Sequence, residues 1–152
     1  MLVKTHLIIA LTLVLIIMPF IDDKLLFSFV LIISSLIPDI DTKESYLGKN
    51  TFFRPLQFFI KHRSIMHSLA FGICISIIIY LVFPIVSYGF FIGFMSHIFA
   101  DSLTKEGVFI LWPYKKRFNG MIKTGGYIEK IIFLSLVIFD ALILSFHLLV
   151  IN

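Results

Sequence analysis

Long apolar stretches alternate with short polar ones along the whole chain. Five stretches are nearly free of charge, and we predict a helix in each: residues 7–21, 25–37, 68–87, 88–100 and 131–151. A helix needs about 20 residues to cross the hydrocarbon core of a bilayer. The third and fifth stretches reach that length, whereas the second and fourth are shorter and would lie inside a bundle or beside thinned bilayer. We expect the uncharged turn between the third and fourth helices at residues 84–89.

The composition indicates a membrane protein. Of the 152 residues, 59% are hydrophobic and 14% are charged, and the mean hydropathy is +1.04. Soluble domains are about half apolar and about a quarter charged, so this chain has too little polar surface to cover a water-soluble globule. We predict one all-α domain over residues 1–152, a polytopic integral membrane bundle with two interfacial loops. Residues 19–22 lack the small-residue pattern of a cleavage site, so the first stretch is expected to be a retained helix and not a signal peptide.

The positive charges predict an orientation. If the five helices alternate in direction, twelve of the thirteen basic residues fall on one side: Lys4, five within residues 39–64 and six within residues 101–130. Basic loops remain in the cytoplasm, so we expect a multi-pass protein of the inner (cytoplasmic) membrane with a cytoplasmic N-terminus. Topology accounts for the net charge of +4. We therefore expect membrane lipids, and not nucleic acid, as partners.

Side chains that bind metals gather at the same predicted face. The candidate ligands are His6, Asp39, Asp41, His67, His97 and Asp101, and His62 and Glu129 accompany them. His97 and Asp101 are four residues apart and share one face of a helix, so both can reach one ion. Imidazole and carboxylate groups without thiolate suit zinc foremost, with manganese or iron as alternatives. The number of ligands would allow one or two ions.

Each of these residues also has an ordinary interpretation. A histidine at a helix start, such as His6, is commonly interfacial, and Asp39 and Asp41 could simply solvate a loop. Ionisable groups at membrane depth are costly and usually face the bundle interior, so the set as a whole favours a site. His62 and His67 are five residues apart and would converge only at an irregular helix start.

One acidic residue lies away from this face. Asp140 is in the middle of the last helix, about 16 Å beyond Glu129 at 1.5 Å per residue, which is too far to share the site. We expect it to hydrogen-bond to another helix, with Ser76 or Tyr80 of the third as candidates. A proton pathway is the alternative interpretation.

The order of these motifs resembles a known family. His6, "PDID", "HRSIMHS", "HIFADSLT", "GVFILWPYKKRF" and "KTGGYIEK" are similar to the LexA-regulated, membrane-bound metal-dependent hydrolases, the YdjM-like proteins, along nearly the whole chain. The H-R-x-x-x-H-S and H-x-x-x-D-x-x-T-x-x-G blocks are the most specific. The chain departs from the family pattern at Ser64 and Gly126, neither of which is a candidate ligand. The resemblance implies a metal-dependent hydrolase without naming its substrate.

A looser similarity is to zinc-dependent phospholipase C, an all-helical enzyme that also carries an H-x-x-x-D helix motif. The spacing of its other ligands differs, so the likeness is an analogy. It implies a central metal site with His6 nearby, formed by Asp39, His67, His97 and Asp101.

We expect a hydrolase of phosphoesters or phospholipid-like substrates that uses metal-activated water at the cytoplasmic membrane face. Glu129 or His62 would act as general base or orient a ligand. The candidates for binding the substrate phosphate are Arg63, Lys115, Lys116 and Arg117. The main alternative is a non-enzymatic membrane protein, such as a stress-response scaffold, with a structural metal site. A transporter is a third hypothesis, supported only by Asp140 near the midplane.

Overall fold

The computed structural model describes residues 1–41, 49–54 and 65–151, and its regular elements are all helical. Its α-helices are α1 (Val3–Ile17), α2 (Lys24–Ser34), α4 (Leu69–Tyr80), α5 (Pro84–Ser102) and α6 (Tyr127–Ile151). Short 3-10 helices are η1 (Met18–Phe20), η2 (Ile37–Asp41), η3 (Thr51–Phe53) and η4 (Ile65–His67). The predicted all-α class is therefore confirmed for the described part of the chain.

The boundary between the third and fourth helices differs from the prediction. Helix α4 ends at Tyr80 and α5 begins at Pro84, so the turn lies at residues 81–83 and not at 84–89. Proline lacks an N–H and is favoured in the first turn of a helix, where that N–H would have no helical partner. As a result α4 has only 12 residues, whereas α5 has 19. The expectation that the third helix is long enough to span a bilayer is wrong.

Two helical segments in the described residues are long and apolar enough to cross a membrane. They are Val3–Phe20 and Tyr127–Leu149, with mean hydropathies of 2.1 and 2.4. Length and composition alone identify them as candidate spans. The predicted count of five spans is not confirmed.

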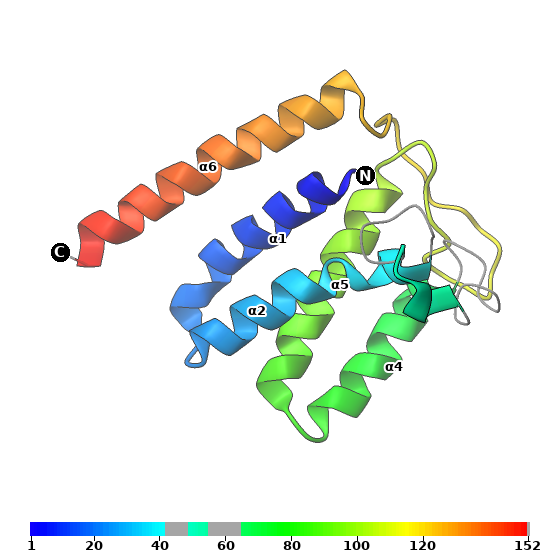
Figure 1. Cartoon of the computed structure of the whole chain (residues 1–152), viewed down its shortest axis with the longest axis horizontal. Helices are drawn as coiled ribbons and strands as arrows, with labels where there is room; N and C mark the ends of the chain where they lie inside the picture. The colour runs from blue at the N-terminus through cyan, green and yellow to red at the C-terminus, as the bar shows by residue number, and fades with distance from the viewer. Residues whose placement is uncertain (42–48, 55–64, 152) are drawn as a thin grey trace.

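Helix α5 lies at the centre of the bundle and packs against both α2 and α4, while α6 lies along α1 (Figure 1). Gly93 allows the close approach of α2 to α5, because a Cβ at this position would lie 2.2 Å from the Leu31 carbonyl oxygen. Small residues at such crossings are typical of membrane helix pairs. Two buried apolar clusters flank this contact: Ala10, Val14, Phe27 and Leu31 in one, and Phe90, Phe94, Ile98 and Val108 in the other.

Helix α6 is joined to α1 by two acid–threonine contacts. The Thr5 hydroxyl donates to Glu129 at 2.7 Å, and the Thr12 hydroxyl lies 2.7 Å from Asp140 Oδ1. Asp140 thus pairs with another helix as predicted, but the expected partners on the third helix are wrong. The reason is tertiary: α6 packs on α1, so Asp140 meets Thr12.

Several chain segments meet at one end of the molecule. Figure 1 shows the N-terminus, the last turn of α5 and the loop that leads into α6 at the same end, with η2 beside them. The loop between α5 and α6 is held by isolated backbone bridges, Thr104 to Ile122 and Val108 to Phe118. This end contains the candidate site.

Candidate metal centre

Three histidines and three aspartates from four elements meet in one buried cluster. Helix α1 contributes His6 and α5 contributes His97 and Asp101, while η2 contributes Asp39 and Asp41 and η4 contributes His67. The six residues predicted as metal ligands are therefore close together. We call this group the histidine–aspartate cluster.

The cluster contains two overlapping triads. In one triad the possible ligand atoms of His6, His97 and Asp101 lie within 4.8 Å of one another, and the same holds for Asp39, His67 and His97 in the other. His97 Nε2 is 3.6 Å from Asp39 Oδ1 and 3.7 Å from Asp101 Oδ2. His6 Nε2 is 3.4 Å from Asp101 Oδ1. These separations suit side chains arranged around a small cation more than direct hydrogen bonds.

Asp101 faces both triads with different oxygens. Its Oδ1 points to His6, while its Oδ2 lies 3.7 Å from His97 and 4.0 Å from His67. The amino group of Met1 also donates a hydrogen bond to Oδ1. Its place on α5, one turn after His97, explains why both side chains enter the cluster.

Irregular backbone at η2 and η4 places the remaining ligands. Pro38 lies in η2 after α2 has ended, and the two aspartates that follow face different histidines. Asp39 approaches His97, whereas Asp41 Oδ2 lies 3.3 Å from His67 Nδ1. His67 lies in η4, and Ser68 caps α4 by accepting a hydrogen bond from Phe71 N. The chain at His67 is thus irregular, which is the condition stated for His62 and His67 to converge, but His62 lies outside the described residues.

His97 is oriented as a metal ligand. Its Nδ1 donates to the Ser35 carbonyl oxygen at 2.7 Å, which leaves an unprotonated Nε2 facing Asp39 and Asp101. That Nε2, fully buried, has no hydrogen-bond partner among the described residues, nor has either ring nitrogen of His6. Buried polar atoms without partners are costly, and a metal ion would satisfy them. The donor set therefore fits a divalent ion such as zinc.

The rings themselves are packed closely. His6 and His97 stack with their centroids 3.9 Å apart and their planes 8° apart, and His67 meets His97 edge-on at 5.4 Å. Burial raises the pKa of the Asp39 carboxyl; His6 opposes the rise and Asp101 adds to it. A bound cation would favour the ionised form of Asp39, which is the form that coordinates.

Glu129 lies beside the cluster but is engaged elsewhere. Its carboxylate accepts hydrogen bonds from Leu2 N at 2.7 Å, Thr5 Oγ1 at 2.7 Å and Gly125 N at 2.5 Å. These bonds hold the start of α6 to the start of α1, which carries His6. They support a positioning role, and its predicted role as a general base stays a prediction.

Of the other predicted site residues, some lie outside the described part of the chain and some lie on an exposed loop. His62 and Arg63 lie outside the described residues. Lys115, Lys116 and Arg117 are exposed on the loop between α5 and α6, so their predicted contact with substrate stays a prediction. The sequence did not predict that the Ser35 carbonyl oxygen accepts a hydrogen bond from His97. Every residue has a backbone carbonyl, so no side-chain pattern identifies the one that orients a histidine.

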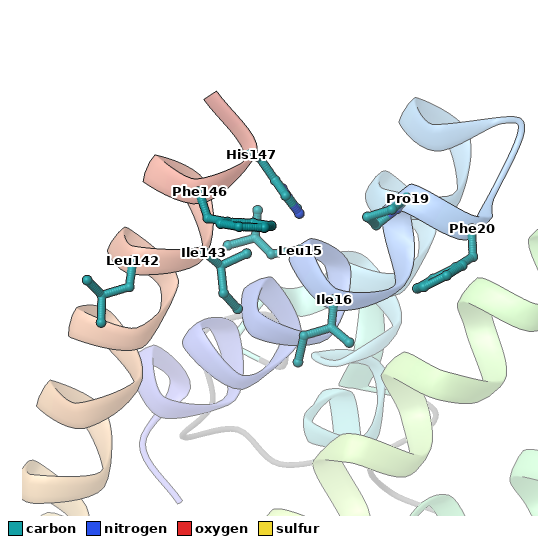
Figure 2. Close-up of a pocket in the computed structure, with 8 residues that line it drawn as sticks. All are labelled: Leu15, Ile16, Pro19, Phe20, Leu142, Ile143, Phe146 and His147. Carbon is teal, nitrogen blue, oxygen red and sulfur yellow. The ribbon is translucent and has the colours of Figure 1, made fainter. Parts of the chain in front are cut away.

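The cavity in Figure 2 lies elsewhere. It has a volume of about 430 Å³ and lies between the ends of α1 and α6 distant from the cluster, bordered by Leu15, Phe20, Ile143 and His147 among others. Leu15 is about 13.5 Å from His6 along the helix axis at 1.5 Å per residue. His147, the histidine not predicted to join the site, lines this cavity. Its walls are mostly apolar, and among the described residues the groups that could hold a metal ion lie in the cluster.

Comparison with known proteins gives a match along the chain. The model of the family described as YdjM inner membrane protein matches residues 1–151. The chain is 32% identical over 121 residues to Inner membrane protein YdjM of Escherichia coli (strain K12), and equally to that of Shigella flexneri. The alignment covers 72% of this chain and 62% of each relative, so it spans less than two thirds of their length. No solved structure matches the chain.

Proposed function

Since the chain belongs to the family of YdjM inner membrane proteins, as its sequence motifs predicted, we propose that it is a membrane-bound metal-dependent hydrolase. The observation that carries the proposal is the histidine–aspartate cluster, in which His97 presents a buried, unpartnered Nε2 to two carboxylates. We infer phosphoesters, including phospholipid-like molecules, as the substrate class. The candidate spans and the basic loop beside the cluster support this choice.

The chain's own residues divide the work of holding the ion. His6, His67, His97, Asp39 and Asp101 would coordinate, because their ligand atoms form the two triads. Asp41 would orient His67 through Nδ1, as the Ser35 carbonyl orients His97. Glu129 would keep α1, and therefore His6, in place. When bound, a divalent ion supplies an acidified water and polarises the phosphoryl oxygen.

The geometry also limits how two ions could be held. His97 uses Nδ1 for its hydrogen bond to Ser35, so its Nε2 is available to one ion only. Asp101 presents Oδ1 to His6 and Oδ2 to His67, so it is the residue that could serve both triads. We propose zinc, with manganese or iron as alternatives.

The proposed topology places this end of the bundle at the cytoplasmic face of the inner membrane, in a multi-pass arrangement. The positive-inside distribution of the basic residues supports it. Single cysteines in a Cys74→Ser background, labelled with an impermeant maleimide in intact cells and in lysed cells, test this orientation. A cysteine at position 116 should label only after lysis, and one at position 22 should label in intact cells. The reverse pattern would overturn the orientation.

A structural metal clamp is the second candidate function. The observation in its favour is burial: His6, His67, His97 and Asp101 are at most 2% exposed, and they join α1, η4 and α5. A clamp would bind metal and stabilise the fold without hydrolysing anything.

The deciding experiment begins with the metal content of detergent-purified protein. We expect one or two zinc equivalents per chain in the wild type, lost in His97→Ala and in Asp101→Ala while the helical circular dichroism persists. His147→Ala is the matched control, because it removes an imidazole outside the cluster. A wild type that takes up neither zinc nor manganese would refute both candidates.

The metal-loaded protein is then assayed with phosphodiester and phospholipid substrates. Turnover by the wild type, absent from His97→Ala, would establish the hydrolase. Metal binding without turnover, with a melting temperature that falls on chelation, would establish the clamp.

A further inference from the structure

The loop between α5 and α6 ends in an exposed tip of mixed apolar and basic character. Residues 111–117, which we call the tip, are all exposed: Leu111, Trp112, Pro113, Tyr114, Lys115, Lys116 and Arg117. Tyr114 is 77% exposed, Leu111 44% and Trp112 38%. Three large apolar side chains are thus followed by three cations, with no acidic residue between them. Exposed apolar groups beside cations are typical of surfaces that lie at a membrane interface.

The base of the tip is held by backbone hydrogen bonds. Val108 and Phe118 exchange two of them, each at 2.9 Å, and the Val108 side chain is fully buried. Cation–π contacts with two phenylalanines of this base position two of the cations. The Arg117 guanidinium lies 5.0 Å from the centroid of the Phe109 ring, and Lys116 Nζ lies 5.5 Å from the centroid of the Phe118 ring. The tip therefore projects from a defined base.

The same base is bonded to the segments that carry the metal ligands. Leu69 N, two residues after His67, donates to the Ile110 carbonyl oxygen at 2.8 Å. The Thr104 hydroxyl donates to the Asp101 carbonyl oxygen at 2.7 Å. The tip is thus placed at the end of the molecule that holds the histidine–aspartate cluster (Figure 1).

We propose that the tip docks on the surface of an anionic phospholipid bilayer. Leu111, Trp112 and Tyr114 lie in the headgroup layer, and the three cations contact lipid phosphates. Charge complementarity selects this partner, because the cytoplasmic leaflet is negatively charged and attracts juxtamembrane cations. This proposal rests on the proposed membrane orientation and does not require hydrolase activity.

Trp112 provides a direct test, because it is the only tryptophan in the chain and lies in the tip. Full-length protein is placed in nanodiscs of phosphatidylcholine alone or mixed with phosphatidylglycerol, and quenching of its fluorescence by acrylamide is measured. Three cations favour the docked tip on the order of 100-fold on an anionic surface. We expect blue-shifted emission and reduced quenching in anionic discs, reversed when salt shortens the Debye length from about 30 Å to about 3 Å.

Two variants of equal charge separate the tip from general electrostatics. The first variant replaces all three cations of the tip with glutamine: Lys115→Gln, Lys116→Gln and Arg117→Gln. It should abolish the difference in Trp112 quenching between the two lipid compositions. The control removes the three exposed lysines at positions 24, 49 and 130, outside the tip, and should preserve it. Equal quenching of the wild type in both discs would overturn the proposal, as would an equal loss in both variants. Protection of Trp112 by a short DNA duplex but not by anionic lipid would overturn it in favour of a nucleic-acid partner.

Discussion

Gly93→Ala tests whether the packing of α2 on α5 sets the geometry of the metal centre. A Cβ at residue 93 would lie 2.2 Å from the Leu31 carbonyl oxygen and 3.1 Å from Ser34 Cβ. An ordinary contact begins at 3.4 Å, so α2 must move away by about 1.2 Å at this level. The obstacle is backbone, which cannot rotate out of the way as a flexible side chain can.

The displacement matters because α2 leads directly into η2. Asp39 in η2 faces His97 on α5 across the contact that Gly93 allows, with 3.6 Å between Oδ1 and Nε2. The Ser35 carbonyl, which fixes the His97 ring, follows α2 as well. Metal coordination tolerates shifts of only a few tenths of an ångström. A movement of about 1 Å should therefore disturb both the ligand and its orienting bond.

The expected magnitude comes from two effects. Overpacking of this kind costs about 1–3 kcal/mol of folding free energy. We expect zinc affinity to fall at least tenfold, the range in which loss of an orienting contact usually lies, about 10–100-fold. If the site hydrolyses a substrate, a misplacement of about 1 Å can cost on the order of 100-fold in rate.

The assay is competitive zinc titration of detergent-purified protein, alongside its melting temperature with and without metal. Gly89→Ala is the graded control, because its Cβ would meet the Phe27 carbonyl oxygen at 3.0 Å and needs a much smaller shift. Its zinc affinity should stay closer to that of the wild type. If Gly93→Ala binds zinc as the wild type does, the α2–α5 spacing does not control the centre.

Three further predictions concern single side chains. Asp41→Asn should weaken zinc binding about 10–100-fold without abolishing it, measured by competitive titration, because Asp41 contacts Nδ1 of His67; complete loss would make Asp41 a ligand. Zinc affinity should fall as pH decreases, because the histidine ligands and Asp39, whose pKa is raised by burial, do not coordinate when protonated; pH-dependent titration checks this, and a flat profile would contradict it. Thr12→Val should lower the free energy of unfolding by about 0.6–1.7 kcal/mol in a thermal or denaturant scan, because it removes the hydrogen bond from Thr12 to Asp140. An unchanged free energy of unfolding would show that this hydrogen bond is dispensable.

Sequence patterns were sufficient where the chemistry is local. The i,i+4 spacing of His97 and Asp101 predicts a shared helix face in any helix, and both side chains do enter the cluster. The basic and apolar segments likewise predict that His6, Asp39 and His67 lie at one end of the bundle. That end was recognisable because ionisable groups beside long apolar stretches are costly in a bilayer and usually face the interior of the bundle together.

Tertiary pairing could not be obtained in this way. The partner of Asp140 depends on which helix α6 packs against, and several helices carry hydroxyl groups at a suitable depth. Glu129 was predicted as a general base because it lies at the same end of the bundle as the ligands. Its carboxylate instead accepts hydrogen bonds from the backbone N–H groups of Leu2 and Gly125, and backbone donors leave no pattern in the sequence. The boundary between α4 and α5 was also misplaced. The chain is apolar on both sides of Pro84, so hydropathy does not mark where one helix ends, and only the preference of proline for the first turn of a helix indicates that α5 begins there.

The composition of the triads bears on the choice between hydrolase and clamp. Structural zinc sites commonly have four protein ligands, whereas catalytic sites have three and leave a position for water or substrate. Each triad in this cluster offers three, with His97 shared. A single closed site built from His67, His97, Asp39 and Asp101 would leave the buried nitrogens of His6 without partners. A second ion would bring His6 into use, and because the Nε2 of His97 can serve only one ion, the five residues of the two triads would not supply four protein ligands to each. The side chains that could hold an ion are thus too few for two closed four-ligand sites, and this is the argument that favours the proposed hydrolase over the clamp.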